Sequence, residues 1–230
     1  MHISLRYPAV ELLTAVLFVG CYVSFGATWL TLKACVFCFL TIGLIFMDAE
    51  MGLLVHEFTY PGMALGLALS VVPSLDPSGT DLLLSALGMR GVSQGPKIWL
   101  LDSIVGAAFG AGFFYLMWAL YYLVRRRHGM GFGDIALMAM VGTFLGLKLT
   151  VLVVFLAPIM AALAGVVVLF VNPHPDANSG TDVPTSTADA SFAKTLLSRE
   201  VPFGIYLGIS SLIVLFSGKL IWDWYLELFR

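Results

Sequence analysis

Charged side chains are scarce in this chain of 230 residues, where 11% are Asp, Glu, Lys or Arg and 60% are hydrophobic. The mean hydropathy of +0.96 lies far outside the usual range of soluble globular domains. One water-soluble core cannot hide so much apolar surface, but several helices of about 20 residues can place it against lipid. The net charge of −2 excludes a basic nucleic-acid-binding protein. We therefore expect an integral membrane protein.

Cysteine is also rare, and a disulfide framework is not expected. Cys21, Cys35 and Cys38 lie in or beside apolar stretches, where a thiol behaves as a small hydrophobic group. Cys35 and Cys38 form a C-x-x-C pair, but neither a second pair nor a nearby histidine completes a zinc site. No secretory signal peptide is evident, so the first apolar stretch is predicted to be a retained helix. We expect no metal and no cofactor.

Long apolar stretches make up most of the chain and predict an all-α fold. We expect a polytopic transmembrane bundle of about six to seven helices with short cytoplasmic loops, forming a single domain over residues 1–230. The second and fifth stretches are shorter than a full crossing needs, and each abuts an aspartate, as expected beside a water-accessible cavity. The stretches lie near residues 9–31, 34–47, 60–74, 98–124, 135–147, 149–171 and 203–222.

The loops predict the orientation of the bundle. Three consecutive arginines at 125–127 follow the fourth stretch, and a basic cluster beside a span marks the cytoplasmic side. Because each predicted span crosses to the opposite side of the membrane, Arg6 and residues 48–61 are also predicted on the cytoplasmic side. Residues 172–200 are also predicted there, as a flexible loop, because prolines mixed with Ser, Thr, Asp and Asn do not form a packed core. The outer side then receives Lys33, Arg90, Lys97, Lys148 and a short apolar patch at 82–87.

Two aspartates border apolar helices on the same predicted side. Asp48 directly follows the run 34–47, where an ionised carboxylate loses much of its hydration. From position alone, Asp48 could equally mark the membrane boundary. Asp134 follows three alternating glycines in the segment 129–133, which either loosen a turn or let an extended substrate backbone pass the carboxylate. Apolar residues resume at once, so Asp134 is predicted at a helix N-terminus, where the helix dipole stabilises its anion.

Two carboxyl groups at the same membrane depth suggest a pair that shares one proton. The ionised acid acts as general base on water, while the protonated acid polarises the scissile carbonyl, which is aspartyl protease chemistry. Neither a serine triad nor an H-E-x-x-H motif competes with this interpretation. His56 is a candidate neighbour of the pair. A different class of function also fits, namely a proton-coupled transporter or channel that uses Asp48 and Asp134 as relay groups.

At these residues the sequence resembles the type IV prepilin peptidase family, the membrane aspartyl peptidases with a G-x-G-D motif. Gly131, Gly133 and Asp134 match that motif. Val55 and His56 depart from the pattern around the first aspartate, and Ala136 stands where many members have lysine. The residues that follow the first pattern in register are Asp48, Glu50, Leu54, Thr59 and Pro61, and the family's P-F-G turn is matched by Pro202, Phe203 and Gly204.

The resemblance implies a bacterial inner-membrane enzyme of type IV pilus or type II secretion systems. Such an enzyme cuts the basic leader from prepilins or pseudopilins at the cytoplasmic face, and its oligomeric state is left open. An intramembrane peptidase of the same chemistry that cuts other helices is a rival, but the register after Asp48 argues against it. The implied catalytic residues are Asp48 and Asp134, and the implied substrate-binding or supporting residues are Glu50, His56, Glu57, Gly131, Gly133, Pro202, Phe203 and Gly204.

One part of the family pattern is not visible in the sequence. The family's first helix and its cysteine-rich cytosolic insertion, which is associated with methylation of the new N-terminus, have no counterpart here. The segment 3–11 is instead similar to the stretch that follows the insertion. We therefore expect a peptidase-only short form or a truncated chain.

Overall fold

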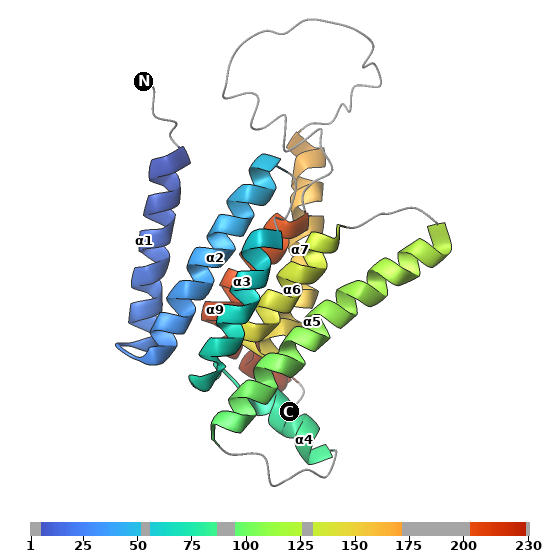
Figure 1. The fold of residues 1–230 in the computed structure, drawn as a ribbon. Helices are drawn as coiled ribbons and strands as arrows, with labels where there is room; N and C mark the ends of the chain where they lie inside the picture. Colours follow the sequence, from blue (N-terminus) through green and yellow to red (C-terminus); the bar gives the residue numbers. More distant parts are fainter. Residues whose placement is uncertain (1–5, 52–55, 87–94, 126–130, 172–202, 229–230) are drawn as a thin grey trace, which may run out of the picture.

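Helices form the architecture throughout the described part of the chain. A computed structural model describes residues 6–51, 56–86, 95–125, 131–171 and 203–228, and these ranges contain no β-strand. The predicted all-α bundle is therefore confirmed. In chain order (Figure 1), the elements are α1 (Arg6–Phe25), α2 (Trp29–Met51), α3 (His56–Ala68), the 3₁₀ helix η1 (Leu69–Val71), α4 (Ser78–Ala86), α5 (Pro96–Arg125), α6 (Phe132–Leu145), α7 (Leu147–Val171) and α9 (Phe203–Leu228).

The length and composition of the described helices fit a multi-pass membrane protein. Four of them, α2, α5, α7 and α9, are long and apolar enough to cross a membrane. Shorter apolar helices accompany them at Val10–Phe25, Phe58–Val71 and Phe132–Leu145. Large apolar side chains cover much of the outer surface of α1, α5 and α7, as expected for helices that face lipid.

The second helix is longer than the sequence analysis predicted. We expected a short helix over 34–47, whereas α2 has 23 residues and begins at Trp29. Gly26 divides the apolar run 9–31, because its φ of 67° ends α1 in a left-handed cap. In this cap the Gly26 N–H donates to the Tyr22 carbonyl at 2.8 Å. Consequently, Asp48 lies in the last turn of α2 rather than beyond its end.

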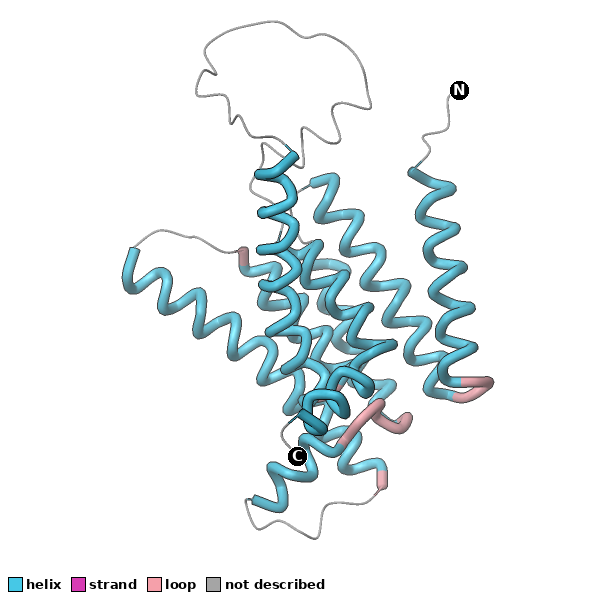
Figure 2. Tube along the Cα trace, turned by 180° about the vertical axis from the view of Figure 1, so that it is seen from behind, coloured by secondary structure: helices cyan, strands magenta, loops and turns pink. Residues whose placement is uncertain are grey.

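The helix ends fall on two opposite sides of the bundle, as both views of the chain show (Figures 1 and 2). One side carries the start of α1, the ends of α2 and α5, and the starts of α6 and α9, and we call it the acid side. The opposite side, called the far side, carries α4 and the turn between α6 and α7. This arrangement agrees with the alternation predicted from the arginines at 125–127. The predicted loop 172–200 lies outside the described residues.

The short helix α6 forms the centre of the bundle, because every residue from Ala136 to Leu145 is buried. Its backbone touches the backbone of α5 where Gly106 and Gly142 face each other. A Cβ added to Gly106 would lie 2.6 Å from the Gly142 carbonyl oxygen, and one added to Gly110 would lie 2.6 Å from the Met138 carbonyl oxygen. Small residues four positions apart allow this kind of close packing between membrane helices. The pair α5–α6 is therefore held at a fixed, short separation.

A third buried acid, Asp102, joins several helices at the far side. Its Oδ1 accepts hydrogen bonds from the Thr80 hydroxyl at 2.6 Å and from the Leu147 N–H at 3.0 Å. Asp102 thereby caps the start of α7 and ties it to α4 and α5. Lys33, which was expected on the outer side between the first two apolar stretches, lies within α2, is only 2% exposed and interacts with the charge of Asp102. The sequence did contain a signal for this cluster, because an acid inside the apolar stretch 98–124 is expected to have a polar partner within the bundle.

An ion pair next to this cluster lies at the start of α7. The Lys148 ammonium donates to Asp76 Oδ2 at 2.6 Å and lies 5.1 Å from the centre of the Trp222 ring. Burial alone raises the pKa of Asp76, but hydrogen bonds and charge from Lys148, with hydrogen bonds from Ser78, lower it overall. The pair thus fixes the loop before α4 against α7.

Candidate active site

Asp48 and Asp134 are both buried at the acid side of the bundle. Asp48 is 4% exposed in the last turn of α2, and Asp134 is 7% exposed as the third residue of α6. The two carboxyl groups are close enough that the charge of Asp48 acts on Asp134. Folding therefore brings together two acids that lie far apart in the sequence and come from different helices. Their catalytic roles stay predictions.

The start of α9 supplies a hydrogen bond to Asp48. The backbone N–H of Ile205 donates to the carboxylate, and Ile205 is the third residue of α9. An N–H in the first turn of a helix has no partner within that helix, and the helix dipole there favours a negative charge. The other carboxylate oxygen, Asp48 Oδ2, is buried and has no hydrogen-bond partner among the described residues. Sequence reasoning missed Ile205, although the helix start after Pro202 was a usable signal.

Asp134 lies in the first turn of α6, shortly after the helix cap. Gly131 is the N-cap, and the Asp134 N–H donates to the Gly131 carbonyl at 3.3 Å. Gly131 has φ −73° and ψ 141°, which is a backbone conformation open to any residue. Among the described residues, a Cβ added at Gly131 would come within 4 Å of only the Gly133 nitrogen, at 3.9 Å. Neither the backbone conformation of Gly131 nor its described neighbours therefore require glycine at this position.

The other residues predicted at the site are only partly described. Gly133 lies in the first turn of α6, and Phe203 and Gly204 begin α9. The Phe203 ring packs on Phe114 of α5 with centres 6.0 Å apart. Among the described residues, no group of three or more His, Cys, Asp or Glu could hold a metal ion. Pro202 and the side chains of Glu50, His56 and Glu57 lie outside what the structure describes.

The fold and these positions define a class of protein, a multi-pass helical membrane protein with a pair of buried carboxyl groups at one end of its bundle. The chain belongs to the type IV leader peptidase family. The sequence model of that family matches residues 34–166, a range that contains Asp48 and Asp134. The resemblance predicted from the sequence is therefore confirmed.

Curated relatives of this chain include several proteins named prepilin leader peptidase/N-methyltransferase. The one from Aeromonas hydrophila is 29% identical over 230 residues, which cover 99% of this chain and 63% of the relative. The one from Pseudomonas aeruginosa is 32% identical over 234 residues, covering 98% and 63%, respectively. The one from Myxococcus xanthus is 34% identical over 167 residues, covering 73% and 43%. The chain thus spans less than two thirds of the length of these relatives, and no solved structure matches it.

Proposed function

We propose that these residues form a membrane aspartyl endopeptidase that cuts the basic leader from prepilins or pseudopilins at the cytoplasmic face of the bacterial inner membrane. The observation that carries the proposal is the burial of Asp48 and Asp134 at one side of the bundle, where the charge of Asp48 acts on Asp134. Membership of the leader peptidase family and the names of the relatives support the substrate class. The proposal covers leader cleavage and does not extend to methyl transfer.

In the proposed mechanism, the two carboxyl groups hold one proton between them, because two adjacent carboxylates repel each other when both are ionised. The ionised acid takes a proton from water as the water oxygen attacks the carbonyl carbon of the scissile peptide bond. The protonated acid donates a hydrogen bond to the carbonyl oxygen, where negative charge develops. The tetrahedral intermediate then collapses as a proton passes to the leaving nitrogen and the C–N bond breaks. The pair can start another cycle once the two products leave.

The short length of α6 supports access from water. A helix of 14 residues is about 21 Å long, which is less than the hydrocarbon thickness of about 30 Å. An acid in its first turn can therefore lie below the membrane surface. At Gly131, where no described side chain lies within 4 Å of the Cβ position, an extended peptide backbone can approach the start of α6. A substrate with an apolar helix could dock in the bilayer while its polar leader remains in water.

The proposal is tested by incubating the purified protein in detergent with a prepilin that carries its leader. We expect one cut between the leader and the apolar segment, identified by the mass of both products. A wild-type protein that cuts no leader but moves protons after reconstitution in liposomes would support the transporter interpretation instead.

The hydrogen bond from Ile205 to Asp48 can be removed separately. Ile205→Pro deletes the N–H, and proline is tolerated in the first turn of a helix because that N–H has no intrahelical partner. We expect kcat for leader cleavage to fall about 10- to 100-fold, the size of one lost hydrogen bond to a charged group. Ile205→Val keeps the N–H and serves as the control, with thermal unfolding measured for both variants. Equal rates in the two variants would show that this hydrogen bond does not support the reaction.

A further inference from the structure

The end of α5 at the acid side separates from the rest of the bundle. Phe114 is buried, but none of the residues from Tyr115 to Val124 is buried. Figures 1 and 2 show this half of α5 leaning away from the other helices. The helix has 30 residues, and no charged residue occurs between Tyr115 and Val124. The separated half of α5 is therefore an apolar surface beside the acid side.

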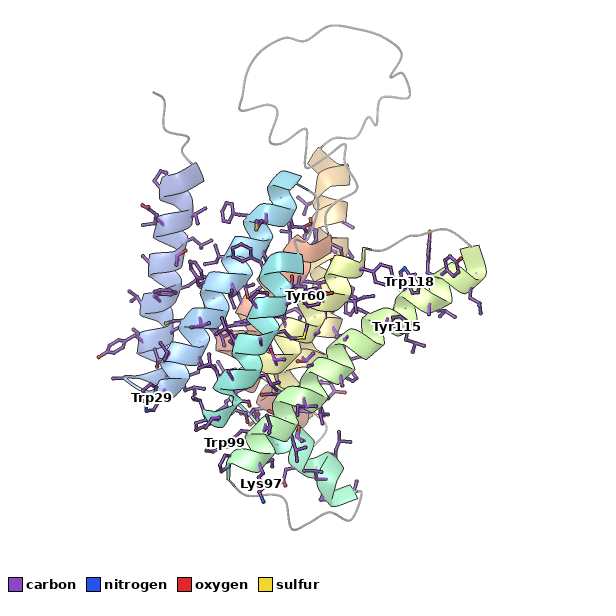
Figure 3. All side chains as sticks on the ribbon, in the orientation of Figure 1. Trp29, Tyr60, Lys97, Trp99, Tyr115 and Trp118 are labelled. Carbon is purple, nitrogen blue, oxygen red and sulfur yellow. The ribbon has the colours of Figure 1, made fainter. Side chains whose placement is uncertain are left out.

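Aromatic rings follow one another along this half of α5, and we call Tyr115, Trp118 and Tyr122 the aromatic row. The ring centres of Tyr115 and Trp118 lie 5.7 Å apart, and those of Trp118 and Tyr122 lie 5.6 Å apart with planes at 9°. Tyr115 and Trp118 are labelled along this part of α5 in Figure 3. Seven positions of a helix extend for about 10 Å. The row therefore extends along the helix.

The aromatic side of α5 is continuous with the candidate active site. The Trp118 ring lies 4.9 Å from the ring of Phe132, which is the first residue of the helix that carries Asp134. Phe114 contacts Phe203, the first residue of the helix whose N–H reaches Asp48. Phe132 is itself 51% exposed. An object that lies along the row thus also contacts Phe132, at the start of the helix that carries Asp134.

We propose that the aromatic row, together with Phe132, is the docking surface for the apolar helix of the substrate, the segment on the far side of the scissile bond from the leader. This inference rests on the proposed function. In lipid, helices associate by close packing of side chains rather than by the hydrophobic effect, and rigid aromatic rings provide large packing surfaces. A helix that packs along α5 would in this way bring the boundary of its apolar segment near the start of α6. Docking therefore selects a bond at the boundary of an apolar helix.

Trp118→Ala tests this surface, with two substrates of different length. One is a full prepilin, and the other is a leader peptide that ends a few residues after the scissile bond. For the prepilin we expect KM to rise about 10-fold with kcat little changed, the size of a lost aromatic contact. For the short peptide we expect no change, because it has no helix to dock. Trp118→Phe should restore most of the lost affinity.

Leu116→Ala is the matched control. Leu116 is 64% exposed on the same helix, and two positions turn it by about 200° from Trp118. We expect this variant to cut both substrates as the wild type does. An equal loss on both substrates in Trp118→Ala would mean that Trp118 only positions α6, and equal effects of both variants would mean that the row is an ordinary lipid-facing surface. Either result overturns the docking proposal while the peptidase stands, whereas a wild type that cuts neither substrate contradicts the proposed function.

Photo-crosslinking identifies the occupant directly. A benzophenone amino acid at position 118, in the Asp134→Asn background, should capture the apolar segment of an uncut prepilin, and the same group at position 116 should not. Capture of a second copy of this chain, or of lipid alone, would contradict the proposal.

Discussion

Asp134→Asn should abolish leader cleavage, with an expected loss of about 10³- to 10⁴-fold in kcat, because asparagine cannot take up or deliver a proton at neutral pH. Asparagine has nearly the same size and shape as aspartate, so the core around α6 should stay packed. Thermal unfolding in detergent and initial cleavage rates on a prepilin measure the two effects separately.

Asp48→Asn should lower kcat for leader cleavage by a similar factor, since the mechanism uses both carboxyl groups together. Groups that act as one unit are strongly non-additive, so the double variant should be no slower than the slower single variant. Undiminished cleavage in either single variant would contradict the paired-acid mechanism. Losses that multiply in the double variant would mean that the two acids act independently.

Asp102→Asn is the matched control for the loss of a buried acid. Asp102 is fully buried within α5, but its partners Thr80 and Leu147 lie at the far side of the bundle. Asparagine keeps an oxygen that can accept from the Leu147 N–H, so the cap of α7 persists in a weaker form. We expect a lower thermal midpoint with most of the cleavage activity retained. A loss as large as that of Asp134→Asn would mean that the assay reports stability rather than chemistry.

The fold class could be predicted from the sequence because the bilayer constrains composition so strongly. Long apolar runs separated by polar segments predict spanning helices, and the alternation of these helices predicts which loops share a side. The arginines at 125–127 predict which of the two sides is cytoplasmic. The end of the first run could not be located from hydropathy, because Gly26 interrupts it through its backbone conformation. Hydropathy also left Lys33 between two apolar stretches, whereas the charge of Asp102, which acts on the buried Lys33, comes from a residue many positions away.

The sequence predicted those parts of the candidate site that local motifs identify. The glycines before Asp134 and the pattern after Asp48 each identify one acid, and the predicted sidedness places both at one end of the bundle. The N–H of Ile205 is a backbone group that any residue except proline provides, so its identity carries no signal. The packing of Trp118 on Phe132 likewise depends on the direction in which α5 leaves the bundle.

Gly142→Ala should destabilise the protein strongly, because a single added carbon meets backbone rather than a flexible side chain. The nearest atoms to that carbon are the carbonyl group of Gly106 and the nitrogen of Ala107, with the latter 2.5 Å away. Neither helix can relieve the clash without moving as a whole, since α6 is enclosed by its neighbours. We expect the free energy of unfolding to fall by about 3 kcal/mol, which is at the upper end of the usual cost of overpacking a core. For a chain of this size, the thermal midpoint falls by about 6 to 12 °C.

Gly112→Ala makes the same chemical change on α5, but it should stabilise the protein instead of destabilising it. A Cβ at Gly112 meets no atom within 4 Å, and alanine favours a helix over glycine by about 0.5 to 1 kcal/mol. The midpoint should therefore rise slightly. Because α6 carries Asp134 in its first turn, Gly142→Ala should also reduce cleavage at temperatures where the protein is still folded, whereas Gly112→Ala should not. Equal shifts in the two variants would show that α5 and α6 are not in backbone contact, and the rigid support that we infer for Asp134 would then be absent.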